Sequence, residues 1–164
     1  MAAITSKLRW EPNDQGIDYL IDRGRLDRVE ASPSTADHLL AEARRHLTSA
    51  KTLSATDDTS MAFVACYDAA RKALSAILVV QGLRAKAGDG GHTVLLDAVR
   101  PQFPDNRREL QRFDWMRTVR NDAEYPDLNS QSVTVADVEE AQEAAAHIVD
   151  LAARFCHSAS LRAE

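Results

Sequence analysis

The stretch from Thr59 to Gly82, TSMAFVACYDAARKALSAILVVQG, decides the fold class of this chain. Apolar residues occupy almost every side of the helix that it predicts, and a helix with so few polar positions is normally central. Asp57 or Asp58 is the predicted N-cap, because a short carboxylate accepts hydrogen bonds from the first free amides of a helix. Gly82 tolerates the left-handed conformation that commonly ends a helix. We therefore expect a helical protein built around this segment.

Amphipathic helices are predicted on both sides of the central segment, since apolar residues recur there at helical spacing. Ser34 is the predicted N-cap of the first of them, with Asp37 as its capping-box acid. Thr134 and Asp137 repeat this pattern before the last one. The helix between them ends before Pro126, because proline disfavours a helical conformation in the preceding residue. The predicted segments are 32–55, 106–125 and 134–155.

The predicted architecture is all-α, an antiparallel four-helix bundle with short additional helices. One short helix covers 17–29 and is broken at Gly24, and another covers 92–100 and ends before Pro101. Residues 83–92 are interpreted as a glycine-rich loop, and no strand pattern is found. A chain of 164 residues suits one domain. We divide it into an N-terminal arm with a short helix at 1–32, the bundle at 33–157 and a frayed tail at 158–164.

The composition argues against several protein classes. The formal net charge is -5, whereas a protein that coats DNA is usually basic, so bulk DNA binding is not expected. Cys66 and Cys156 lie in apolar helical surroundings and are expected to be reduced core thiols of a cytoplasmic protein. No apolar run reaches the length of a membrane span. His38, Glu42 and His46 share a helix face, but the Glu-x-x-His pattern of diiron bundles is missing, so we expect neither metal nor cofactor.

Three stretches carry a family resemblance: MAFVACYDAARKALSAIL at 61–78, QGLRAKAGDGGHTVLLDAV at 81–99 and LQRFDWMRTVRNDAEYP at 110–126. Their order and spacing resemble the HEPN superfamily, and the similarity extends over residues 34–155. The resemblance implies an up-and-down helical bundle of the kind found in RNases, toxins and antitoxins. It also implies that the third stretch is the functional helix.

The RNases of that superfamily combine an arginine, which holds the scissile phosphate, with a histidine a few residues later, which acts as acid or base. Two such sites face each other across a dimer. Here Arg120 and Asn121 match the arginine–asparagine pair of the family, and Arg117 is a second candidate arginine. No histidine follows either arginine at the required spacing. Tyr125 stands there after Arg120, and a tyrosine with a pKa of about 10 is a poor proton shuttle at neutral pH.

The two arginines have a functional and a structural interpretation. Arg117 and Arg120 would bind a phosphate or an acidic partner, because the guanidinium group matches the geometry of both anions. Alternatively, Arg120 would pair with Glu124 one helical turn later, and Asp68 on the central helix would accept a buried arginine. Asn121 is expected to form hydrogen bonds at the end of its helix rather than to take part in catalysis.

The aromatic and histidine candidates are equally open. Tyr125 would fill the space that histidine occupies in active relatives, or would be a target of nucleotide transfer, as a nearby tyrosine is in some family members. Trp115 would mark a contact surface for a partner, since aromatic residues are enriched at interface centres, or would lie half-buried under the N-terminal arm. His92 is expected to cap the short helix that follows it.

The favoured function is that of a non-catalytic antitoxin that binds and occludes a cognate toxin in a toxin–antitoxin pair. A nucleotidyltransferase is the expected toxin, because such enzymes commonly accompany HEPN proteins. An acidic helical surface would cover a basic channel built for RNA or nucleotide. One alternative is a metal-independent RNase toxin that acts as a homodimer and uses Arg117, Arg120, Asn121 and Tyr125. Another is a nucleotide-binding module with Arg120 on a phosphate.

Overall fold

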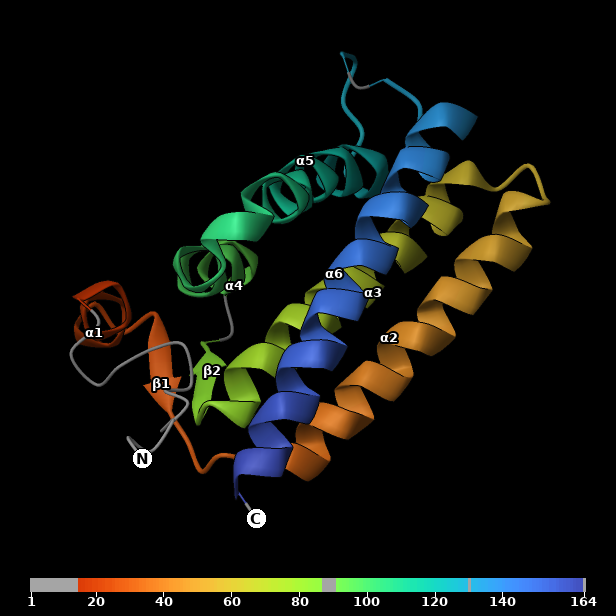
Figure 1. The fold of residues 1–164 in the computed structure, drawn as a ribbon. Coiled ribbons are helices and arrows are strands. Elements are labelled where there is room, and N and C mark those ends of the chain that lie inside the picture. Colours follow the sequence, from red (N-terminus) through yellow and green to blue (C-terminus); the bar gives the residue numbers. More distant parts are fainter. Residues whose placement is uncertain (1–14, 87–90, 130, 164) are drawn as a thin grey trace.

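A computed structural model describes residues 15–86, 91–129 and 131–163 of the chain (Figure 1). The chain is mostly helical, which confirms the predicted fold class. Its elements are α1 (Gln15–Asp22), β1 (Leu26–Arg28), α2 (Pro33–Ser54), α3 (Thr59–Val80), β2 (Leu83–Ala85), α4 (Gly91–Val99), the 3-10 turns η1 (Arg100–Gln102) and η2 (Pro104–Asn106), α5 (Arg107–Glu124) and α6 (Val135–Ala163).

The helix α3 lies at the centre of the molecule and contacts α2, α4, α5 and α6. Figure 1 shows α2, α3 and α6 side by side, with α2 running opposite to the other two, while α5 lies at an angle to them. Alanine makes the close packing of α3 possible, because a small side chain lets neighbouring helix axes approach. Five of its alanines have no exposed surface: Ala62, Ala69, Ala70, Ala73 and Ala76. The expected four-helix bundle stays a prediction in its details, since α5 departs from the common direction.

Both ends of α3 agree with the sequence analysis. The Asp58 carboxylate accepts a hydrogen bond from the Met61 amide at 3.1 Å and so caps the first turn. Gly82 follows the last turn with a φ of 76°. A Cβ atom at this position would also lie 2.9 Å from the carbonyl oxygen of Val29. Glycine is therefore required twice at this position, by the backbone conformation and by the close approach of the segment before α2.

The prediction that the chain has no strands was wrong. β1 pairs with β2 in an antiparallel ladder, with Leu26 opposite Ala85. Each strand has only three residues, which is too short for a recognisable alternation of apolar and polar side chains. The predicted helix at 17–29 therefore ends at Asp22, and part of the predicted loop at 83–92 is strand.

Residues 15–32 are part of the packed structure rather than an arm. α1 contacts α4, and β1 holds this segment to β2. Ile17 and Leu20 of α1 and Leu26 of β1 belong to the buried core. Trp10 and the rest of residues 1–14 lie outside the described part of the chain.

The ends of α2 and α6 correct two further predictions. Ser32, not Ser34, is the N-cap of α2, and its hydroxyl accepts a hydrogen bond from the Thr35 amide at 3.2 Å. Pro33 then takes the first helical position, where a missing amide hydrogen costs nothing. The α6 capping box is confirmed by reciprocal 3.0 Å bonds between Thr134 and Asp137. α6 continues to Ala163, so residues 158–163 extend the helix instead of fraying.

Cys66 and Cys156 are buried and free, as predicted for core thiols. Burial raises the pKa of each thiol to about 12, so neither forms the reactive thiolate at neutral pH. Among the described helices, none combines the length and the apolar character that crossing a membrane would require.

Candidate functional site

The last turns of α5 place the partly buried Arg120 against the central helix α3. Its guanidinium carbon lies 5.6 Å from the centre of the Tyr67 ring of α3, a cation–π distance. One terminal nitrogen is 3.0 Å from Glu124 Oε2, which confirms the predicted pair, and the other donates to Asn121 Oδ1 at 3.4 Å. Arg120 Nε is buried and has no acceptor among the described residues. The arginine is thus held by its own helix and by an aromatic ring.

Arg117 and Asp68 lie near this centre but do not pair with each other. Arg117 donates to Asp114 Oδ1 at 3.0 Å, one turn earlier on α5. Asp68 accepts from Arg71 Nε at 3.4 Å, so the prediction that it receives an α5 arginine was wrong. α3 therefore contributes a third guanidinium group, that of Arg71, which the sequence analysis did not include. Each of the three arginines has a carboxylate partner within its own helix.

Tyr67 joins the arginines to a histidine from another helix. Its fully buried ring stacks on Phe113 of α5, with ring centres 5.2 Å apart. Its hydroxyl forms a hydrogen bond of 2.5 Å with Nδ1 of His92 at the start of α4. The expectation that His92 caps α4 was therefore wrong, because its side chain reaches across to α3. No described residue forms a hydrogen bond with the other ring nitrogen, Nε2.

The surroundings keep His92 neutral. Burial is the main cause that lowers the pKa of His92, and the nearby positive charges of Arg71, Arg120 and Arg117 lower it further, while Asp68 opposes them. Burial also raises the pKa of Tyr67 to about 12 despite the same arginines, so its hydroxyl stays protonated.

The hydroxyl of Tyr67 can both donate and accept a hydrogen bond. It can therefore hold the His92 tautomer in which Nδ1 carries the hydrogen. In that tautomer Nε2 is a free base at neutral pH.

Arg71, Arg117 and Arg120, together with Tyr67 and His92, are called the arginine cluster below. The other predicted residues lie at its margin. Tyr125 is 76% exposed at the end of α5, and the interpretation that it fills the space of the family histidine stays a prediction. The backbone carbonyl of Asn121 accepts from the Tyr125 amide at the end of α5, and the expected role of its side chain at the helix end stays a prediction. Trp115 is half-buried, and its ring meets Phe63 of α3 edge-on at 5.5 Å. It therefore packs on the central helix.

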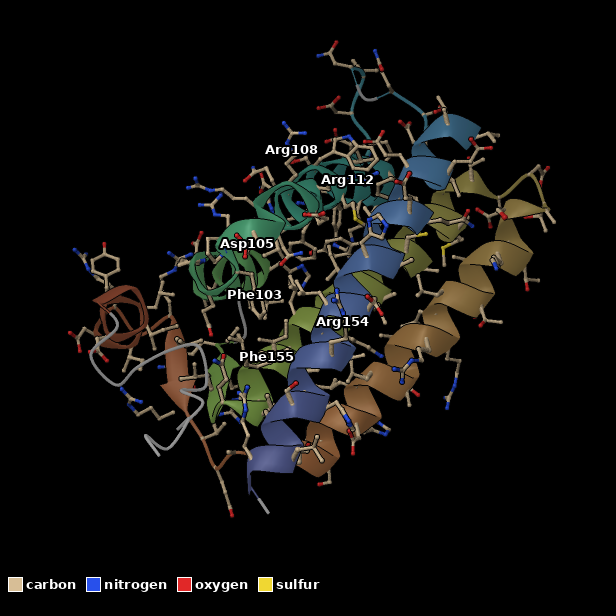
Figure 2. The ribbon with its side chains drawn as sticks, in the orientation of Figure 1. Phe103, Asp105, Arg108, Arg112, Arg154 and Phe155 are labelled. Carbon is tan, nitrogen blue, oxygen red and sulfur yellow. The ribbon has the colours of Figure 1, made fainter. Side chains whose placement is uncertain are left out.

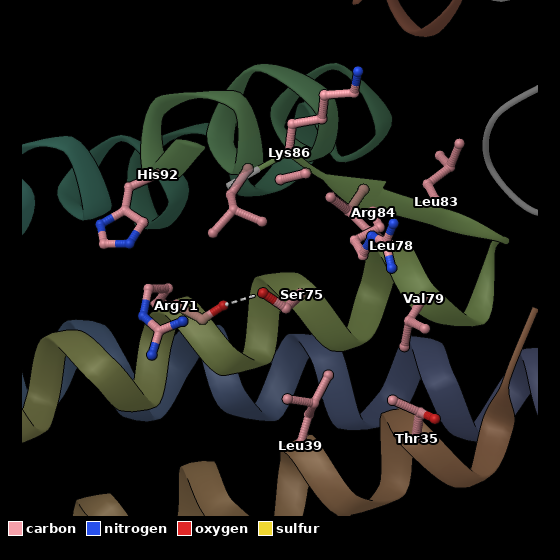
Figure 3. Close-up of a pocket in the computed structure, with 12 residues that line it drawn as sticks. Thr35, Leu39, Arg71, Ser75, Leu78, Val79, Leu83, Arg84, Lys86 and His92 are labelled. Carbon is pink, nitrogen blue, oxygen red and sulfur yellow. Dashed lines mark hydrogen bonds between the residues drawn. The ribbon is translucent and has the colours of Figure 1, made fainter. Parts of the chain in front are cut away.

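A cavity of about 440 Å³ lies next to His92 and Arg71 (Figure 3). The close-up shows His92 of α4 above Arg71 of α3 at one end, with Leu39 of α2 and Val79 farther along. The two residues that the arginine cluster shares with this cavity are therefore accessible from it. The cluster is open on this side and closed by Tyr67 and Phe113 on the other.

Two further arginines form ion pairs away from the arginine cluster. Arg112 lies where α5 meets α6, and Arg154 lies farther along α6 (Figure 2). Arg112 of α5 donates to the Glu140 carbonyl of α6 at 3.1 Å and has carboxylates of Glu140 and Glu143 at 3.9 Å. Arg154 pairs with Asp150 on the surface of α6 at 3.1 Å. These contacts tie helices together or lie in solvent, and no histidine accompanies them among the contacts described here.

His92 is the candidate functional residue that the sequence analysis missed. Its partner Tyr67 is 25 residues away in the chain, and the family pattern directs attention to residues that follow the arginine. The only local signal was a histidine directly after the glycines that precede α4. Among the described residues, no group of three or more histidine, cysteine or acidic side chains is arranged to hold a metal ion.

A comparison with family models matches residues 36–156 of the chain to the HEPN domain. No curated protein matches the chain, and no solved structure matches it either.

Proposed function

The chain belongs to the HEPN family, whose domain covers residues 36–156, and from this premise we propose that its arginine–histidine site binds and cleaves RNA without a metal. The observation that carries the proposal is the position of His92. The sequence lacks the histidine that should follow the arginine, and that absence favoured an antitoxin. In space, a different histidine, His92, is hydrogen-bonded to Tyr67, and the ring of Tyr67 also contacts the Arg120 guanidinium.

The chemistry follows from the charges and the protonation states of the cluster. The guanidinium groups of Arg117 and Arg120 would bind the non-bridging oxygens of a phosphodiester, a role that suits their fork geometry. His92 Nε2, neutral at pH 7, would take the proton of the ribose 2′-hydroxyl as general base. The 2′-oxygen then attacks phosphorus and the bond to the 5′-oxygen breaks. The 5′-oxygen takes up a proton from water and His92 returns its own proton to the solvent, which leaves a 2′,3′-cyclic phosphate and a 5′-hydroxyl.

The test is a cleavage assay on labelled single-stranded RNA in the presence of a chelator. We expect the His92→Ala variant to cleave about 10²- to 10⁴-fold more slowly than the wild type, the usual contribution of a general base. Arg120→Lys is expected to weaken RNA binding, since lysine cannot form a bidentate contact. His147→Ala is the matched control, because His147 is exposed on α6. An inactive wild type, or an equally active His92→Ala variant, would refute the proposal.

The antitoxin remains a second candidate because of one observation. Arg71, Arg117 and Arg120 each already have a carboxylate from their own helix, so the cluster needs no phosphate to balance its charge. The net charge of -5 also suits an acidic surface that covers a basic channel of a nucleotidyltransferase or another toxin.

The two candidates are separated by purifying the tagged protein from its native host at endogenous level. Stoichiometric recovery of a nucleotidyltransferase or another toxin, with no RNA cleavage, would support the antitoxin. Recovery of the protein alone as a homodimer that cleaves RNA would support the ribonuclease.

A further inference from the structure

The cavity beside His92 is built from four elements and has two chemical sides. α2, α3, β2 and α4 all contribute to its wall. Its apolar side is formed by leucine and valine side chains, with Leu39 of α2 facing Leu78 and Val79 of α3 (Figure 3). Its volume of about 440 Å³ lies within the range of small-molecule sites, roughly 300–1,000 Å³.

The polar side of the cavity is positively charged. Arg71, Arg84 and Lys86 line it together with the neutral His92, and no carboxylate is among its described lining residues. The three cations share two carboxylates from outside the cavity, and one of these, Asp68, lies 3.4 Å from Arg71 Nε. Asp27 serves both Arg84 and Lys86, at 3.6 Å and 3.7 Å, and these distances are long for ion pairs. An anion that enters the cavity would therefore meet an unbalanced positive charge.

Arg71 and His92 form one end of the cavity, while Arg84 lies beside Leu78 farther along (Figure 3). His92 and Arg71 face each other from α4 and α3 at one end, and the apolar side chains continue along α3 and α2 from there (Figure 3). A ligand that uses both sides must carry its charge at one end of an apolar body. A free inorganic anion would leave the apolar wall in contact with water, and a neutral apolar molecule would leave the cations without a counter-ion.

We propose that this cavity binds a small amphipathic anion, with a phosphate or carboxylate between Arg71 and His92 and an aromatic or aliphatic body against Leu39 and Val79. The site differs from the arginine cluster in its ligand and in most of its residues. It shares Arg71 and His92 with that cluster. If the proposed RNA cleavage is correct, the bound anion would therefore occupy the general base and inhibit the reaction.

The test titrates 1-naphthyl phosphate into the full-length protein and follows binding by calorimetry and by NMR of isotope-labelled protein. We expect saturable binding, with NMR shifts concentrated at His92, Leu78 and Val79. Inorganic phosphate and 1-naphthol, each of which has one half of the ligand, should bind at least about tenfold more weakly. 1-Naphthoate replaces the phosphate by a carboxylate, and the tighter of the two identifies the head group that the site prefers.

Two variants test the two sides of the cavity separately. Arg71→Gln should weaken binding about ten- to a hundredfold, the usual effect of removing a hydrogen bond to a charged group. Leu39→Glu should weaken it similarly by placing a negative charge in the apolar wall, and its half-exposed position makes the variant compatible with folding. Arg107→Gln is the control, because Arg107 is exposed at the start of α5 and distant from the cavity.

The proposal would be overturned by absent binding, by NMR shifts in the wild type that lie elsewhere, or by equal binding of inorganic phosphate alone. None of these measurements uses RNA. A protein that binds the ligand but does not cleave RNA refutes only the ribonuclease, and one that cleaves RNA but does not bind the ligand refutes only this site.

Discussion

Two polar pairs connect α3 to the segment that follows it, and they differ in one respect. Gln81 and Gln102 are each 4% exposed and exchange amide hydrogen bonds of 2.5 Å and 3.2 Å, and Gln102 also donates to the Ala98 carbonyl at 2.9 Å. Tyr67 and His92 share one bond, and the histidine lies on the wall of a cavity. Gln81 and Gln102 are called the closed pair, because both are buried and bond to each other. Tyr67 and His92 are called the open pair, because His92 also lines a cavity.

The closed pair supports the structure, whereas the open pair has a ring nitrogen that a ligand could reach. A buried amide pair that satisfies its own donors and acceptors orients η1 against α3 and offers nothing to a ligand. The imidazole of His92 keeps one nitrogen without a partner among the described residues, in surroundings that lower its pKa. Perturbed titratable groups that line cavities are typical of functional sites. The two pairs should therefore respond differently to substitution.

The largest effect on stability is expected at the closed pair. Gln102→Leu removes both partners of the buried Gln81 amide, and a stranded buried polar group costs about 1–3 kcal/mol of the free energy of unfolding. The measurement is urea denaturation of the two proteins. The double variant Gln81→Leu/Gln102→Leu should recover much of this loss, because the Gln81 amide is then no longer left buried and unpaired.

The exposed Gln131→Leu substitution is the control for the closed pair and should change stability by less than about 0.5 kcal/mol. If the double variant is as unstable as the sum of the single variants, the amide pair contributes more than its own hydrogen bonds, and the comparison fails.

A smaller loss is expected at the open pair. Tyr67→Phe removes one hydrogen bond and should cost about 0.5–1.5 kcal/mol, because His92 Nδ1 can turn to water in the cavity. RNA cleavage should fall together with a change in the tautomer of His92, observed by ¹⁵N NMR of the ring. Tyr125→Phe is the matched control, since Tyr125 is 76% exposed. An unchanged tautomer in Tyr67→Phe would show that the phenol does not orient the ring.

The smallest effect concerns pH. Because the pKa of folded His92 lies below its ordinary value of 6.5, the unfolded chain binds more protons as the pH falls through this region, and stability decreases. His92→Gln should reduce this loss between about pH 7.5 and about pH 5, as measured by urea denaturation at each pH. His46, whose pKa burial also lowers, leaves part of the dependence in place. A steeper dependence in His92→Gln than in the wild type would contradict the direction given for His92.

Local features of the fold were predicted well, because local interactions decide them. The N-cap of α3 at Asp58, the left-handed Gly82 and the capping box of Thr134 and Asp137 depend on residues within one turn of one another. The pair of Arg120 with Glu124 follows from the helical repeat alone. The N-cap of α2 was placed at Ser34 instead of Ser32, because two serines flank the proline and only the packed chain selects between them.

Features that join distant segments were missed. The pairing of β1 with β2 connects Leu26 to Ala85, and strands of three residues have no periodic signal of their own. The bond between Tyr67 and His92 is a further example, since 25 residues separate them in the chain. In both cases the partner lies far away in the chain, and only the packing of the two segments against each other brings it into contact.

The sequence by itself determined that this chain is helical, that 59–82 lies at its centre and that two arginines stand near the end of α5. Helical periodicity and helix caps depend on residues a few positions apart, so they can be identified from the sequence without knowledge of the fold. Only the tertiary structure decided that His92, from a helix that precedes these arginines in the chain, shares the Tyr67 side chain with Arg120. A functional site depends on which side chains meet in space, and helix packing brings together residues whose separation in sequence has no period.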